Sequence, residues 1–149
     1  MKNAEIIAKL NLEQKCALLS GAGTFTTRGC PKAGIPSITL SDGPNGVRKQ
    51  AGAADHLGLN PSVPATCFPT SATVANSWDP ALGEAVGEAM GEEAAAQEVS
   101  VLLGPGLNIK RSPLCGRNFE YFSEDPYLAG KMAAGYVRGI QKNGIAACP

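Results

Sequence analysis

The chain has 149 residues, of which 44% are hydrophobic and 17% are charged, and its 13 basic and 13 acidic residues give a net charge of +0. This composition predicts one packed domain, or part of a larger one, and excludes a disordered chain. Because the charges balance, the chain lacks the basic surface of a nucleic-acid-binding protein, and we expect no nucleic-acid partner and a neutral or weakly charged ligand.

The cysteines and the lengths of the hydrophobic runs indicate in which cellular compartment the chain is expected. The five cysteines are odd in number and contain no CxxC pair, which predicts reduced thiols in the cytoplasm, with no zinc site or disulfide framework. Glu5 interrupts the apolar stretch at the N-terminus, so we expect no signal peptide, and no apolar run approaches ~18 residues, so we expect no membrane span. His56, the single histidine, is interpreted as an ordinary loop residue, which leaves no metal cluster.

The first third of the chain reads as two short helices followed by a strand. Residues 3–20 carry apolar side chains at roughly helical spacing, with Asn11 as the N-cap between two helices. The β-branched run 35–40 predicts a strand that ends just before Asp42, although an Asp ahead of Gly-Pro is by itself typical of a turn. Residues 49–64 are expected to form a loop, and residues 68–74 a weak second strand.

The clearest helix begins at Asp79-Pro80, with Asp as N-cap and Pro in the first turn, and runs to about residue 97. Its side chains fall into three rows at four-residue spacing: an apolar row of Leu82, Val86 and Met90, a glycine row of Gly83, Gly87 and Gly91, and an acidic row of Glu84, Glu88 and Glu92. Since glycine costs ~1 kcal/mol relative to alanine in a helix, three in register predict close packing against a neighbour. The acidic row is expected to face solvent.

The rest of the chain alternates between predicted strands and helices. Residues 98–103 predict a third strand, a second Asp-Pro pair at 125–126 begins a helix to about residue 142, and residues 145–148 begin a fourth strand. Strands alternating with helices indicate an α/β fold with a parallel sheet. Four strands cannot close a (β/α)₈ barrel, which takes ~250 residues, so in that fold this chain is the N-terminal half.

The loop after the third strand, residues 114–126, is the densest in functional side chains. Arg117 offers a planar set of donors suited to hydroxyls or a carboxylate, Glu120 is close enough to orient it, and Phe119, Tyr121 and Phe122 are candidate pocket walls. Spacing alone fits a simpler alternative at least as well: a surface ion pair beside a helix start.

Three contiguous segments carry a resemblance to a known family: SDGPNGVR at 41–48, FPTSATVANSWDP at 68–80 and LLGPGLNIKRSPLCGRNFEYFSEDP at 102–126. They resemble glycoside hydrolase family 3, specifically the N-terminal barrel domain of its β-glucosidase branch, and the similarity runs from about Asn11 to the last residue. The resemblance implies a TIM-type (β/α)₈ barrel domain, here partial over 1–149, with leading helices in 1–22 and the first strands and helices in 35–149.

The resemblance also implies a function: retaining, exo-acting hydrolysis of terminal β-D-glucosyl residues, without metal or cofactor. Asp42 then matches an aspartate that accepts hydrogen bonds from glucose hydroxyls, Arg117 an arginine that donates to them, and Arg48 a second arginine near the pocket. Asp42 and Arg117 both follow strands, where barrel enzymes build their sites. We expect Glu120 to hold Arg117 in place.

The two catalytic carboxyl groups of the family match no residue of this chain. In the family a Lys-His pair follows the position of Pro149, and the nucleophile and the acid/base lie later still, whereas retaining chemistry needs two carboxyl groups ~5–5.5 Å apart. Glu124 and Asp125 are better explained as a helix start. We therefore predict a sugar-binding wall that needs the rest of the barrel or self-association. The alternatives are a non-catalytic fragment with weak sugar binding, a β-xylosidase, or an unrelated α/β binding domain.

Overall fold

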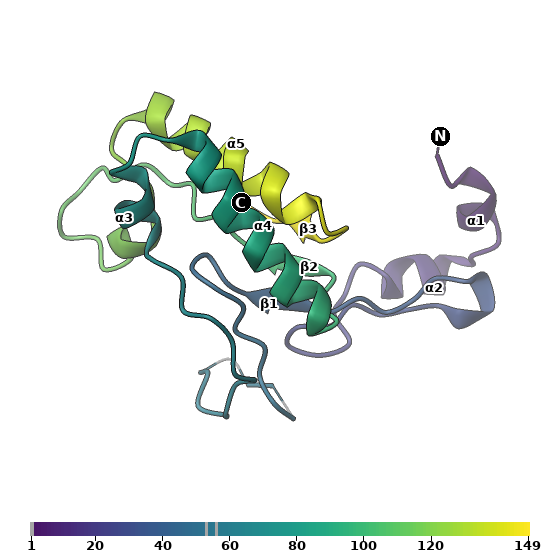
Figure 1. Cartoon of the computed structure of the whole chain (residues 1–149). Coiled ribbons are helices and arrows are strands. Elements are labelled where there is room, and N and C mark those ends of the chain that lie inside the picture. The colour runs from purple at the N-terminus through teal and green to yellow at the C-terminus, as the bar shows by residue number, and fades with distance from the viewer. Residues whose placement is uncertain (1, 53, 56) are drawn as a thin grey trace.

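The computed structural model describes residues 2–52, 54–55 and 57–149, so the interpretation of His56 lies outside the described residues. Its N-terminal arm carries two short helices, α1 (Ala4–Ala8) and α2 (Leu12–Ala17), which stand away from the main body in Figure 1. Asn11 caps α2 as predicted: its Oδ1 accepts from the Gln14 N–H at 2.8 Å, and the Gln14 side chain accepts from the Asn11 N–H at 2.9 Å. A 3₁₀ turn, η1 (Pro31–Ala33), follows the arm.

A parallel sheet forms the centre of the body, in the order β1 (Leu40–Asp42), β2 (Val101–Leu103) and β3 (Ala146–Ala147). Leu40 is in register with Val101, and Val101 with Ala146. The parallel α/β fold class is therefore confirmed. The strands are shorter than predicted, and β1 begins only where the segment 35–40 ends, because Thr27 and Cys30 pair with residues 35–38 in an antiparallel hairpin instead.

The second predicted strand, residues 68–74, is wrong. Residues 71–75 form a helix, α3 (Ser71–Ala75), whose N-cap Thr70 accepts a hydrogen bond from the Thr73 N–H through its hydroxyl. The β-branched residues suggested a strand, but the cap and the burial of Ser71 and Val74 against the body outweigh that weak preference. The sheet consequently contains three strands among the described residues.

Two long helices cover one face of the sheet side by side (Figure 1): α4 (Pro80–Ala96) and α5 (Pro126–Gln141). Both begin as predicted, with Asp79 accepting from the Ala81 N–H at 2.8 Å and Asp125 accepting from the Tyr127 N–H at 3.0 Å. The glycine row of α4 faces α5: a Cβ at Gly83 would lie 3.2 Å from Met132, and one at Gly91 would lie 2.7 Å from the Ile140 carbonyl. The prediction of close helix packing is confirmed.

The acidic row of α4 is only partly solvated. Glu84 pairs with Arg138 and with Lys142 at 2.9 Å each, and Glu88 pairs with Lys142 at 2.8 Å, while Glu92 is exposed. Lys142, followed by Arg138, lowers the pKa of the Glu84 carboxyl. Glu88, whose side chain is 43% exposed, and Glu92 still meet solvent as expected, whereas the ion pairs were not predicted because the basic side chains belong to α5, far along the chain.

Strand alternation decides which side chains reach the site. Ser41 and Leu102, at the middle of β1 and β2, are buried beneath the helices, so their neighbours Leu40, Asp42, Val101 and Leu103 lie on the opposite, half-buried face. Asp42 is therefore at the carboxyl end of the sheet and on the face that the helices leave uncovered.

No helix in the described part of the chain is long and apolar enough to span a membrane.

Candidate functional site

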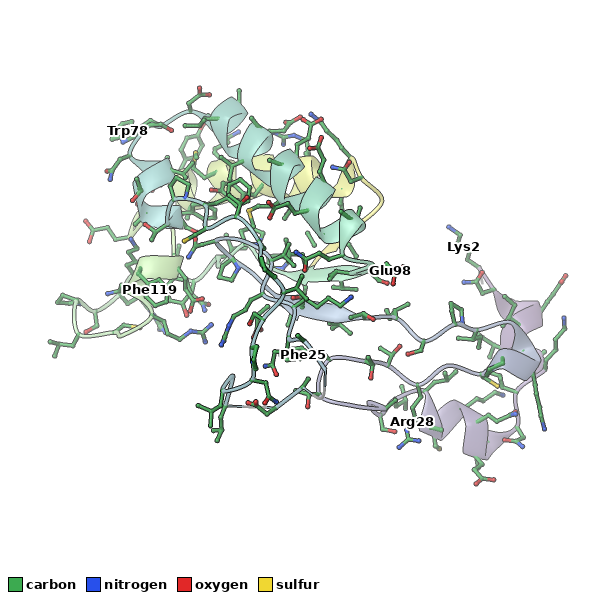
Figure 2. All side chains as sticks on the ribbon, turned by 60° about the horizontal axis from the view of Figure 1, so that its bottom comes forward. Lys2, Phe25, Arg28, Trp78, Glu98 and Phe119 are labelled. Carbon is green, nitrogen blue, oxygen red and sulfur yellow. The ribbon has the colours of Figure 1, made fainter. Side chains whose placement is uncertain are left out.

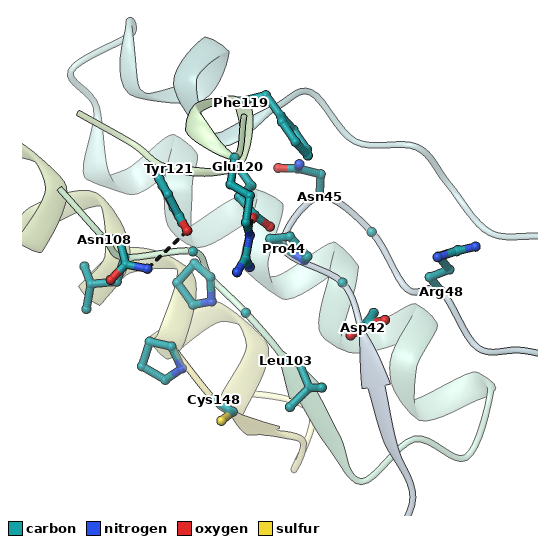
Figure 3. Close-up of a pocket in the computed structure, with 18 residues that line it drawn as sticks. Asp42, Pro44, Asn45, Arg48, Leu103, Asn108, Phe119, Glu120, Tyr121 and Cys148 are labelled. Atoms are coloured by element: carbon teal, nitrogen blue, oxygen red, sulfur yellow. Dashed lines mark hydrogen bonds and ion pairs between the residues drawn. The ribbon is translucent and has the colours of Figure 1, made fainter. Parts of the chain in front are cut away.

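A pocket of about 890 Å³ lies at the carboxyl ends of the three strands (Figure 3). Each strand contributes the residues that follow it, and the loop before α5 closes one side. The lining consists of residues 42–46 and 48, 103–108, 117 and 119–121, and 148–149. Parallel α/β folds bind ligands at this end, because the loops there converge while the helices and sheet hold them.

Asp42 is the last residue of β1, and the chain turns sharply after it. Its carbonyl accepts from the Arg48 N–H at 2.9 Å, which closes the turn. Gly46 has φ +137, and a Cβ there would meet the Thr66 carbonyl, so this position requires glycine. Asn45, which the sequence interpretation missed, lines the pocket and accepts from the Ser71 N–H at 3.0 Å, so it ties the turn to α3.

Arg117 and Glu120 pair as predicted, on the 3₁₀ turn η2 (Asn118–Glu120). Arg117 Nε donates to Glu120 Oε1, and this hydrogen bond is the main cause that raises the pKa of the guanidinium. The Arg117 side chain is 70% exposed and that of Glu120 only 11%. The buried Glu120 carboxylate therefore anchors Arg117, whose guanidinium projects into the pocket. The structure brings Asp42, Arg117 and Glu120 to one cavity.

Arg48 lines the rim of the same pocket, but its side chain is hydrogen-bonded to a neighbouring loop. Its Nη2 donates to the Gly58 carbonyl at 2.8 Å, and Figure 3 shows the guanidinium turned away from Asp42. Asp55 braces that loop by accepting from the backbone N–H groups of Leu59 and Asn60 at 3.2 and 3.0 Å. Of the predicted site residues, Arg48 is the least directed towards the cavity.

The aromatic wall differs in one member from the expectation. Phe119 and Tyr121 line the pocket, and Figure 2 shows Phe119 on η2. Phe122 is instead 3% exposed and packs edge-on against Tyr136 in the core, at 5.2 Å between ring centroids. Adjacent residues in extended chain point to opposite sides, so Tyr121 and Phe122 cannot both face the pocket.

Asn108 and Cys148 also line the pocket and were missed. Asn108 follows the carboxyl end of β2 and Cys148 that of β3. This place after a strand was the only signal in the sequence that could have identified them. The five cysteines are free, and no group of three His, Cys, Asp or Glu in the described ranges is arranged to hold a metal. The Asp42 carboxylate, the Arg117 guanidinium and amide side chains around an open cavity suit a ligand rich in hydroxyl groups.

Comparison with known proteins agrees with this geometry. The model of the glycosyl hydrolase family 3 N terminal domain matches residues 40–148. Thermostable beta-glucosidase B of Acetivibrio thermocellus is 56% identical over 144 residues, 97% of this chain and 19% of that protein. An exo-alpha-(1->6)-L-arabinopyranosidase of Bifidobacterium longum is 51% identical over 140 residues, 93% of this chain and 18% of that protein.

Solved structures give the same result. Beta-glucosidase 3B from Thermotoga neapolitana, in complex with alpha-D-glucose, has a TM-score of 0.88 and 40% identity, covering 99% of this chain and 22% of that one. The chain thus spans about a fifth of the length of the relatives it matches. Its parallel strands and covering helices are the opening part of an N-terminal barrel domain, and the chain belongs to glycoside hydrolase family 3.

Proposed function

We propose that this chain forms one wall of the glucose-binding subsite of a retaining, exo-acting β-glucosidase. The observation that carries the proposal is the meeting of Asp42 and Arg117 in one pocket at the carboxyl ends of the strands. The names of the relatives support it, since the Acetivibrio protein is a beta-glucosidase and the Thermotoga structure is in complex with alpha-D-glucose. The substrate is accordingly a β-glucoside with a terminal, non-reducing glucose.

The two residues have complementary roles. The Asp42 carboxylate accepts hydrogen bonds from ring hydroxyls, and the Arg117 guanidinium donates to a neighbouring hydroxyl. Glu120 orients Arg117, while Arg48 shapes the rim by holding its loop at the Gly58 carbonyl and contacts the sugar only at its edge. No metal or organic cofactor takes part in this proposal.

We assign neither the nucleophile nor the acid/base to this chain. Retaining hydrolysis needs two carboxyl groups ~5–5.5 Å apart across the reacting carbon, and of the carboxylates that line the pocket Glu120 is committed to Arg117. In our proposal both catalytic groups lie in the part of the relatives that this chain does not match. The chain by itself then binds sugar weakly and hydrolyses none.

A pentopyranoside is the second candidate substrate. The Bifidobacterium longum relative is an exo-alpha-(1->6)-L-arabinopyranosidase, and it is nearly as similar to this chain as the beta-glucosidase is. Asp42 and Arg117 contact ring hydroxyls, which pentopyranosides and glucose share, so this wall alone does not choose between them.

The test is a chimeric enzyme in which this chain replaces the matching segment of the Acetivibrio β-glucosidase B. We expect it to hydrolyse an aryl β-D-glucoside, with lower kcat/KM on the β-D-xyloside and the α-L-arabinopyranoside. In Arg117→Ala, kcat should fall and KM rise, lowering kcat/KM about 10- to 100-fold, the value of a hydrogen bond from a charged group.

The matched control is Arg111→Ala, in the same loop but outside the pocket lining, which should keep the parent kinetics. A folded chimera without activity, or one in which Arg117→Ala leaves kcat and KM unchanged, contradicts the proposal. The first result favours the non-catalytic alternative, and the second removes Arg117 from the site.

The cytoplasm is our proposed location, supported by five cysteines that are all free. Cell fractionation with an antibody against this chain tests it, and recovery from the culture medium would refute it.

A further inference from the structure

The loop between β2 and α5 is pinched at its base. Gly106, on the outgoing arm, pairs with Tyr121 on the returning arm as a parallel bridge, and the Lys110 N–H donates to the Ser123 carbonyl at 3.2 Å. Beyond this pinch the tip is open to solvent, with Leu114 93% exposed. Arg117 lies on the returning arm between the open tip and the pinch, so its position depends on how firmly the base is held.

Tyr121 sits at this base and touches both arms. Its hydroxyl accepts a hydrogen bond from Asn108 Nδ2 at 3.2 Å, drawn as a dashed line in Figure 3, and only 6% of the residue is exposed. Gly106 leaves the room that the ring occupies, since a Cβ there would lie 3.1 Å from Tyr121 Cδ1. The ring is therefore fixed in position and in rotation.

The face of this fixed ring lies against Arg117. The guanidinium carbon is 5.8 Å from the ring centroid, within the range of a cation–π contact. The ion pair with Glu120 uses only Nε of Arg117, whose side chain is 70% exposed. The two Nη atoms can therefore still move while the Nε–Oε1 hydrogen bond is kept. A flat ring beneath the guanidinium restricts that movement to one plane.

We infer that Tyr121 and Asn108 are positioning residues for Arg117: the ring of Tyr121 sets the plane of the guanidinium, and Asn108 holds the ring. Neither residue needs to contact the sugar for this role. The inference rests on the proposed function, in which Arg117 donates to a sugar hydroxyl, because a donor held in one plane binds a hydroxyl without losing further side-chain freedom.

The first experiment is a double-mutant cycle in the chimeric enzyme. Tyr121→Leu should lower kcat/KM about two- to five-fold, the change that a cation–π contact at an exposed site corresponds to, mainly through KM. In the Arg117→Ala background the same substitution should have no further effect. Equal losses in both backgrounds would mean that Tyr121 only supports the loop, and would overturn the inference.

Two conservative variants separate the ring from its anchor. Tyr121→Phe keeps the ring and removes the hydroxyl, so it should cost less than Tyr121→Leu and about as much as Asn108→Ala, which removes the other partner of the same bond. These variants also serve if Tyr121→Leu does not fold. If Tyr121→Phe is as damaging as Tyr121→Leu, the ring plane has no role.

A measurement on the chain itself makes the result independent of catalysis. The Arg117 Nε–H, bonded to Glu120, is followed by nitrogen NMR, and its exchange with water should accelerate at least about two-fold in Tyr121→Leu. An unchanged exchange rate refutes the positioning role. If instead Arg117→Ala leaves the chimera's kinetics unchanged while exchange accelerates, the proposed function fails and the positioning of Arg117 stands.

Discussion

Tyr136 shows how one buried atom affects stability without taking part in the site. The residue is 1% exposed, its ring meets Phe122 and the glycine row of α4, and its hydroxyl has no hydrogen-bond partner among the described residues. Burial raises the pKa of this phenol to about 12. A polar atom buried without a partner costs about 1–3 kcal/mol, so packing of the ring must offset that cost.

Tyr136→Phe should therefore stabilise the chain by about 1 kcal/mol at neutral pH, because the ring stays and the unpartnered hydroxyl is removed. The gain should grow with pH. The unfolded chain releases the Tyr136 proton near pH 10, whereas the folded chain keeps it to about pH 12, so between these values the parent undergoes a loss of stability from Tyr136 that is absent in the variant.

Urea unfolding of both proteins by far-UV circular dichroism, at one fixed concentration and at pH 7, 10 and 12, measures the difference. A gap in unfolding free energy between parent and variant that is constant over this range would contradict the buried, protonated phenol.

At the scale of the element, α4 and α5 approach closely because each presents glycine to the other. A Cβ at Gly87 would meet the Tyr136 carbonyl and lie 2.9 Å from Tyr136 Cα, and one at Gly135 would lie 2.5 Å from the Pro80 carbonyl. These neighbours are backbone atoms, which cannot rotate aside. The helices would have to separate to admit a methyl group.

Gly87→Ala should thus destabilise the chain by about 1–3 kcal/mol, although alanine is the better helix former by ~1 kcal/mol. Gly130→Ala is the matched control: Gly130 is in α5, exposed, with open space around its Cβ position, so it should stabilise by about 0.5–1 kcal/mol. The midpoints of urea unfolding compare the two, and shifts of the same sign would refute the packing argument.

The start of α5 offers a second test at this scale, because Asp125 next to Glu124 resembles a catalytic pair. Asp125 Oδ1 accepts from the Tyr127 N–H at 3.0 Å, which is the geometry of an N-cap. Asp125→Ala should cost about 1 kcal/mol of stability, and Asp125→Asn, which keeps the acceptor, much less. In the chimeric enzyme both variants should keep the parent kcat. A large loss of kcat in Asp125→Asn would assign Asp125 a chemical role.

At the scale of the whole molecule, the sheet has one covered and one uncovered face. The helices α4 and α5 lie on the first (Figure 1), and the second carries Leu40, Val101 and Leu103, all half-buried. Within the described residues β1 and β3 are the edge strands. The outer edge of β1 is partly occupied, since the Leu40 N–H donates to the Phe25 carbonyl at 2.8 Å and the Asp42 carbonyl accepts from the Arg48 N–H, so β3 is the edge more open to further pairing. An apolar face beside an open edge favours association.

The isolated chain should consequently self-associate, with an average mass that rises across a tenfold range of micromolar concentrations in sedimentation velocity. Val101→Lys, on the uncovered face, should weaken this association, while Ala134→Lys, on the exposed side of α5, should not. A monomer of 15.3 kDa at every concentration would show that the uncovered face does not drive association.

Signals contained within a few residues were enough to predict several elements. Asn11, Asp79 and Asp125 each cap a helix through N–H groups two or three positions away, so the sequence alone determined where these helices begin. The Arg117–Glu120 pair is local in the same sense. The resemblance to the family, carried by contiguous segments, was likewise readable without a structure.

Contacts between distant segments were decided only by the tertiary structure. Residues 68–74 have strand-like composition, yet α3 begins at Ser71, where Asn45 and the core hold the chain. Arg48 turns to the Gly58 carbonyl, Phe122 turns from the pocket into the core, and Asn108 reaches Tyr121 across the base of its loop. A side chain's surroundings come from whichever segments pack beside it, and those lie too far along the chain for local spacing to predict.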